Sequence, residues 1–150
     1  MESTKYNIGG ERPSRYLREK PEAVARQNEE DNTIVEALRQ DGSDAAMDFL
    51  DYWQEVNKMW NDAVEFVKLV MSGDKIISNE VVEECQGAYL QLSQILHVLL
   101  EMKEAPSVSR ATKAMMMTVS RRAYEDRIEI KKSIETMSQW QREAGIIITG

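Results

Sequence analysis

Few side chains in this sequence could support nucleophilic or general acid–base catalysis. The 150 residues include one histidine, His97, and one cysteine, Cys85. Such catalysis needs reactive groups that converge, and His97 has no cysteine or serine partner at a spacing that suggests a dyad. We expect His97 to face solvent or an interface, and Cys85 to pack as a small apolar residue. The sequence therefore predicts no catalytic residue and a protein that is not an enzyme.

Carboxylates form two clusters, each near the predicted start of a helix. The clusters are Asp44, Asp48, Asp51 and Glu80, Glu83, Glu84. Acidic residues stabilise a helix N-terminus by opposing its dipole, which accounts for both clusters. A carboxylate-bound metal site in a helical bundle usually needs sets of ligands on facing helices, such as a Glu followed three residues later by a His, and no such pair occurs. We therefore expect no metal and no cofactor.

Basic residues are concentrated between residues 109 and 132. They are Arg110, Lys113, Arg121, Arg122, Arg127, Lys131 and Lys132. One interpretation is that this helix packs against acidic helices of the same chain, because opposite charges attract over long range. The other is that it contacts the phosphates of DNA or RNA, and only locally, because the whole chain has a net charge of −7. Both interpretations stay open.

Residues 1–29 resemble an extended segment more than a helix. They contain Gly9-Gly10, Pro13 and Pro21 and few apolar residues, although a helix could begin at Pro21. We predict a flexible arm here. The arm mixes aromatic, apolar and basic side chains that are typical of segments that bind a partner, namely Tyr6, Arg12, Arg15, Tyr16, Leu17 and Arg18. The same composition also occurs in tails without a function.

The most regular pattern lies between Ser43, a good N-cap residue, and Gly73. Apolar residues there recur at alternating steps of three and four, as in a helix that packs against another helix. These residues are Ala46, Phe49, Trp53, Val56, Trp60, Ala63, Val67 and Val70. A second apolar row, Tyr52, Met59 and Phe66, lies beside the first. The apolar face is therefore too wide for a single neighbour.

Residues 78–104 repeat this pattern, with Tyr89 on the flank of the apolar stripe, and end before Pro106. The link at residues 73–77 is short, which makes the two long helices antiparallel neighbours. A shorter helix is expected at residues 30–40, ending at Asp41-Gly42.

The last helix is predicted from residue 107 or 109 to Ala144. Its apolar stripe is expected to change register near residues 116–119, and the successive Met115, Met116 and Met117 cannot all face one core. Gly145 is expected to end the helix, and Ile146 to Ile148 form an apolar, β-prone tail.

Together these patterns predict an all-α fold, an antiparallel helical bundle of three long helices and a short N-terminal helix. The expected organisation is a flexible arm at 1–29, a bundle domain at 30–144 and a short apolar tail at 145–150. A composition of 42% hydrophobic and 30% charged residues fits one folded domain, and no apolar run is long enough to span a membrane. A lone cysteine fits a cytoplasmic protein.

The wide apolar faces favour self-association, with a dimer as the simplest form, or a stable complex with another protein. The residues expected in the core or in an oligomer interface are Tyr52, Trp53, Met59, Trp60, Phe66 and Tyr89. The function that follows is a non-enzymatic adaptor, assembly factor or inhibitor, a class that includes phage and viral accessory proteins. The alternative is a nucleic-acid-binding regulator that uses the basic helix and the arm.

Overall fold

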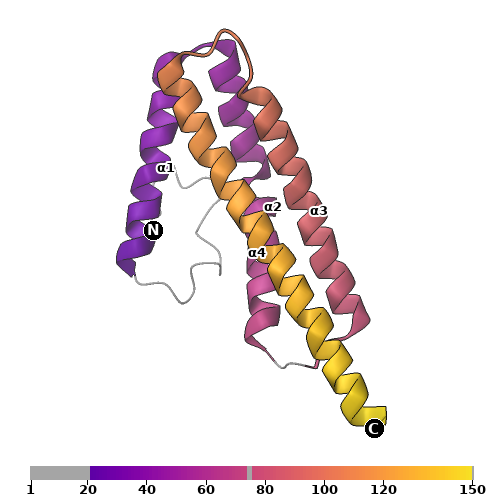
Figure 1. Ribbon diagram of the computed structural model, residues 1–150. Helices are drawn as coiled ribbons and strands as arrows, with labels where there is room; N and C mark the ends of the chain where they lie inside the picture. Colours follow the sequence, from indigo (N-terminus) through magenta and orange to yellow (C-terminus); the bar gives the residue numbers. More distant parts are fainter. Residues whose placement is uncertain (1–20, 74–75, 150) are drawn as a thin grey trace.

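The computed structural model describes the backbone of residues 21–73 and 76–149 and the side chains of residues 25–73 and 76–145. Within these residues the chain is an all-α antiparallel bundle, as predicted. Its helices are α1 (Pro21–Asp41), α2 (Asp44–Ser72), α3 (Asn79–Met102) and α4 (Arg110–Thr149). Figure 1 shows α2, α3 and α4 packed together, with α1 lying against α2 and α4. α1 therefore covers one side of a three-helix core.

The breaks between helices follow the turn residues that the sequence provides. Gly42 adopts a positive φ of 67°, a conformation that favours glycine, and α1 ends immediately before it. Ser43 then accepts a hydrogen bond from the backbone N–H of Ala46 at 3.2 Å, and Ser78 does the same for Val81 at 3.2 Å. Each serine satisfies a donor that the start of the next helix would otherwise leave free.

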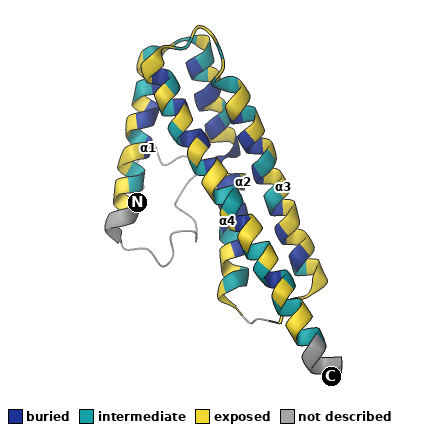
Figure 2. Cartoon of the chain, in the orientation of Figure 1, coloured by how far each residue is buried: buried dark blue, intermediate teal, exposed yellow. Residues whose placement is uncertain are grey.

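The core lies between α2, α3 and α4 and extends under α1. It is built from the apolar stripes that the sequence shows, and the largest fully buried side chains include Trp53, Phe49, Ile34, Leu92 and Met116. In Figure 2 the buried residues of each helix face the interior, whereas the exposed residues face outwards. Among the described residues, none of the helices is both long and apolar enough to cross a membrane.

Two predicted helix boundaries were wrong. α1 begins at Pro21 and not near residue 30, because the weak helix expected at Pro21 continues into the stronger one without a break. α4 continues through Gly145 to Thr149, so Gly145 does not end it. A glycine inside a helix costs only about 1 kcal/mol relative to alanine, which a long helix tolerates.

The predicted change of register in α4 was also wrong. The buried side of this helix is one continuous stripe, formed by Thr112, Met116, Val119, Ser120, Ala123, Ile130 and Met137. The polar Thr112 and Ser120 occupy stripe positions, so the apolar pattern appeared to shift, and Ala111 is exposed. Met116 is buried and Met117 exposed, which confirms that the three successive methionines do not share one core.

Candidate interaction surfaces

A groove lies between α2 and α3, and we call it the α2–α3 groove. Its lining residues are Glu55, Lys58, Met59, Asp62, Ala63, Phe66, Glu84, Gly87, Ala88 and Gln91. Ala63 and Ala88 are buried at its floor, and Met59 leaves 41% of its surface exposed on the α2 side. The groove therefore presents apolar atoms to the outside, with polar groups around them.

Gly87 is one of several residues of this groove that the sequence analysis did not identify. It lies in the middle of α3, where a Cβ built on its backbone would meet nothing within 4 Å. The fold of the single chain therefore does not require a glycine here, although glycine is a poor helix former. A glycine inside a predicted helix was the available signal, because an absent side chain lets another backbone approach closely.

The second apolar row of α2 does not lie in open solvent. Tyr52 and Phe66 are half-buried against the core, while Met59 is more exposed. Burial, together with the nearby Glu55 carboxylate, raises the pKa of Tyr52. Met59 and Phe66 form part of the α2 wall of the groove. This row is thus partly covered by the chain itself and partly available to a partner.

The other aromatic residues predicted for a core or an interface belong mainly to the core. Trp53 and Trp60 are buried, and the Trp60 Nε1–H donates to Asp126 Oδ2 at 2.8 Å across to α4. Tyr89 is half-buried and faces α4. These three side chains hold the bundle together, so they are not available as anchors for a partner.

Arg122 forms ion pairs with residues of the same chain. Its guanidinium pairs with Asp31 and with Glu30 of α1, and its side chain is only 13% exposed. Gln27 lies against the same group, and with its amide oxygen turned toward Arg122 it accepts from all three guanidinium nitrogens at 2.7–3.1 Å. This cluster of Gln27, Glu30, Asp31 and Arg122, which we call the α1 clamp, joins α1 to α4.

Arg127 is also satisfied internally, on the opposite flank of α4. Its Nε–H donates to Ser93 Oγ at 2.9 Å and its Nη2 to Tyr89 Oη at 2.9 Å, and its guanidinium lies 5.1 Å from the centre of the Tyr89 ring. Two of the seven basic residues therefore pack against neighbouring helices. α4 packs against the long helices α2 and α3, while the carboxylates that pair with Arg122 belong to α1.

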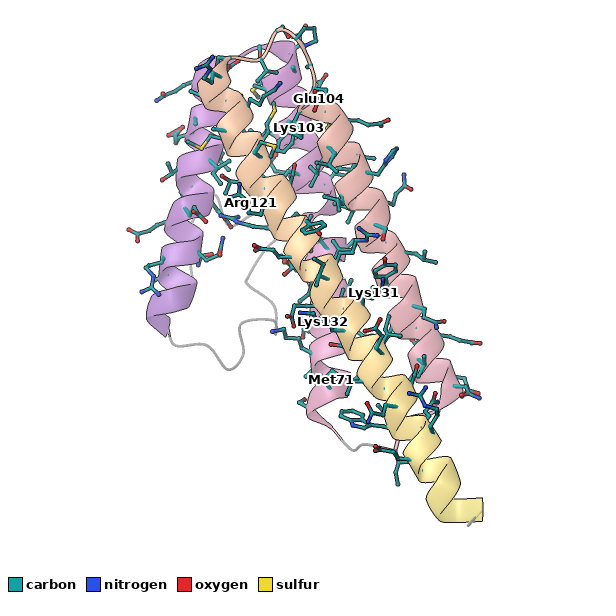
Figure 3. All side chains as sticks on the ribbon, in the orientation of Figure 1. Met71, Lys103, Glu104, Arg121, Lys131 and Lys132 are labelled. Carbon is teal, nitrogen blue, oxygen red and sulfur yellow. The ribbon has the colours of Figure 1, made fainter. Side chains whose placement is uncertain are left out.

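The remaining basic residues lie nearer to solvent. Arg110, Arg121, Lys131 and Lys132 are exposed, whereas Lys113 is half-buried and its charge lowers the pKa of Glu104, after the larger effects of Lys103. Arg121, Lys131 and Lys132 are labelled on α4 in Figure 3. Three apolar or aromatic residues lie on the same part of α4. Met117 and Tyr124 are 36% and 50% exposed, and Ile128 is half-buried. We call these six residues, Met117, Arg121, Tyr124, Ile128, Lys131 and Lys132, the α4 stripe.

The potentially reactive side chains do not converge. Cys85 is fully buried, and burial, with a smaller effect from Glu84, raises the pKa of its thiol to about 11, so the reactive thiolate is scarce near neutral pH. His97 is exposed, with its Nε2 3.4 Å from Glu101 Oε2. Among the described residues, no three His, Cys, Asp or Glu side chains are grouped so that they could hold a metal ion.

The predicted partner-binding residues of the arm, Tyr6, Arg12, Arg15, Tyr16, Leu17 and Arg18, lie outside the described residues. Comparison of the chain with protein-family models, curated proteins and solved structures gives no match.

Proposed function

We propose that this protein is a non-enzymatic, cytoplasmic interaction module that binds a helix of a partner protein in the α2–α3 groove. The observation that carries this proposal is the combination of Gly87 with the exposed Met59 in one groove. A glycine at that point removes the side chain that would keep a partner helix away, and Met59 offers a flexible apolar contact. Adaptor, assembly factor and inhibitor, including viral accessory roles, all fit such a module.

The charges around the groove indicate the chemistry of the partner. The groove is lined by three carboxylates, Glu55, Asp62 and Glu84, and by one cation, Lys58. The Lys58 Nζ lies 2.7 Å from Asp62 Oδ2. Because that ion pair is exposed, it contributes little to stability, and a basic side chain of a partner could pair with Asp62 in place of Lys58. The helix that fits best is amphipathic, with apolar residues at i, i+4 and i+7 and basic residues beside them.

The experiment compares the full chain with two tryptophan variants. Gly87→Trp places an indole in the groove, and the Cβ of the new side chain meets nothing within 4 Å. Gln86→Trp is the matched control, since Gln86 is an exposed neighbour that does not line the groove. Each protein is used as bait in nuclease-treated and untreated lysates. We expect specific protein partners with the wild type and with Gln86→Trp, and their loss with Gly87→Trp.

A partner set that is the same for all three baits would contradict the proposal. The second candidate, a nucleic-acid-binding regulator, draws on the exposed Arg121, Lys131 and Lys132 of the α4 stripe. It predicts salt-dependent retention on DNA or RNA that is lost in Arg121→Glu/Lys132→Glu and is unaffected by Gly87→Trp. The internal use of Arg122 and Arg127 reduces the support for it, because fewer cations remain to neutralise phosphates.

A further inference from the structure

The α4 stripe is an amphipathic surface of the kind that the α2–α3 groove would accept. From Met117 to Lys131 its members follow each other at steps of four and three residues, and Lys132 lies four residues after Ile128, so all six lie on one face of the helix. The opposite face of α4, with Met116, Val119 and Ala123, is buried in the core. The stripe therefore faces away from the molecule.

The charges of the two surfaces are opposite. The groove is lined by three carboxylates and one lysine, whereas the stripe carries three cations. The exposed Glu125 lies four residues after Arg121 and seven before Lys132, on the same face as the stripe, so three cations and one carboxylate leave this face an excess of two positive charges. Glu129 lies on the flank that carries Arg122, toward α1. Complementary charges of this kind steer association and suppress wrong partners.

The stripe is long enough to cover the groove. Met117 to Lys132 extends about 22 Å along α4, and the α2 wall from Glu55 to Phe66 extends about 17 Å, at 1.5 Å per residue. Within one molecule they cannot meet, because α4 contacts α2 and α3 through its buried face. A contact between them requires two molecules.

We propose that the α2–α3 groove of one molecule binds the α4 stripe of a second copy of this chain. This inference rests on the proposed function and names the partner helix for it. The contact joins two different surfaces. After a first contact, the copy that contributes its groove still has a free stripe, and the copy that contributes its stripe still has a free groove. Self-association would then occlude the same groove that other partners use.

The test measures the mass of the purified, nuclease-treated full chain by analytical ultracentrifugation over a range of concentrations. One variant, Gly87→Trp, blocks the groove, and a second, Arg121→Glu/Lys132→Glu, reverses charges of the stripe. Arg26→Glu/Lys68→Glu is the control for the second, because it makes the same change in net charge at exposed positions of α1 and α2 away from both surfaces. Circular dichroism and thermal melting verify that each variant is folded.

We expect the wild type and the control to associate, and each interface variant to associate at least about tenfold more weakly. A mixture of the two interface variants should form a 1:1 heterodimer, because the intact stripe of the first binds the intact groove of the second. No other pair of surfaces gives this result.

Three outcomes would overturn the inference: a wild type that stays monomeric at every concentration, a stripe variant that associates like the wild type, or a mixture that yields no heterodimer. Each of these leaves the proposed function standing as long as Gly87→Trp removes protein partners from the lysate. Conversely, a heterodimer in the mixture would support the inference even if no other partner were found.

Discussion

A substitution at Gly87 tests whether this glycine is required for folding of the single chain or only for binding. Replacing it with alanine adds a Cβ in open space on α3. We expect Gly87→Ala to stabilise the protein by about 0.5–1 kcal/mol, because alanine loses less backbone entropy in a helix. Urea denaturation gives the free energy of unfolding.

The matched control is Gly42, which has a φ of 67° at the end of α1. Gly42→Ala should destabilise the protein by about 1 kcal/mol or more, because an L side chain is strained in that conformation. If Gly87→Ala is also destabilising, the glycine serves the fold of the single chain, and its use as evidence for binding fails.

The Asp41 carboxylate connects the end of α1 to the starts of α2 and α4. Its pKa is lowered to about 2 by hydrogen bonds from the Ser43 hydroxyl, the Thr112 hydroxyl and the Ser43 backbone N–H, with a smaller contribution from Ser109. Ser109 and Thr112 are at the start of α4, and Ser109 Oγ lies 3.2 Å from Asp41 Oδ2. The ionised carboxylate therefore stabilises the junction of α1, α2 and α4.

Because the pKa of Asp41 is lower in the folded state, its contribution is fully present above the unfolded value of about 4 and is lost as the pH falls toward 2. We expect Asp41→Asn to be less stable than the wild type at pH 6, with a difference that narrows between pH 4 and pH 2. Denaturant midpoints across this range provide the measurement. Asp48→Asn, an exposed aspartate of α2, is the control, and an unchanged difference down to pH 2 would contradict the assignment.

At the scale of the helices, the sequence predicted α2 and α3 well, since their long apolar stripes and serine caps are visible in the residues themselves. It was less informative for α1 and α4. Their contacts include polar groups such as Asp31, Thr112 and Ser120, which are buried although their residue types suggest exposure. The α2–α3 groove was only half predicted: Met59 and Phe66 were found from the pattern, while Gly87 and the opposing α3 wall depend on how the helices are paired in space.

The α1 clamp predicts how the loss of Arg122 would affect the stability of α1. Arg122→Leu would leave Asp31, which is 3% exposed, without its guanidinium partner. We expect a loss of about 3 kcal/mol in the free energy of unfolding, because a buried carboxylate without its counter-ion is costly. Hydrogen exchange should show the largest increase in α1, since α1 contacts the bundle on one side only.

Glu30→Gln is the matched control for the clamp, because Glu30 is 54% exposed and an exposed ion pair contributes only about 0–1 kcal/mol. Equal protection of α1 in the wild type and Arg122→Leu would show that apolar packing of Ile34, Val35 and Leu38 is sufficient to hold this helix.

At the scale of the whole molecule, the charge of −7 is unevenly distributed. The exposed cations of α4 lie on a different side of the bundle from the acidic groove, so the molecule has two complementary surfaces that it cannot join by itself. The dimer expected from the wide apolar faces would be isologous, with the same surface on both copies. The contact proposed between groove and stripe is heterologous, and such contacts close into rings or continue as filaments.

The dependence of assembly on salt and concentration distinguishes these arrangements. If groove and stripe bind through opposite charges, the average mass of the wild type should rise beyond that of a dimer as the concentration increases at low salt. It should fall toward that of a monomer in about 1 M NaCl, where the screening length is only about 3 Å. Light scattering at matched concentrations measures both effects. An average mass that levels off at a dimer and does not change with salt would indicate an isologous apolar interface instead, because the burial of apolar surface is strengthened rather than weakened by many salts.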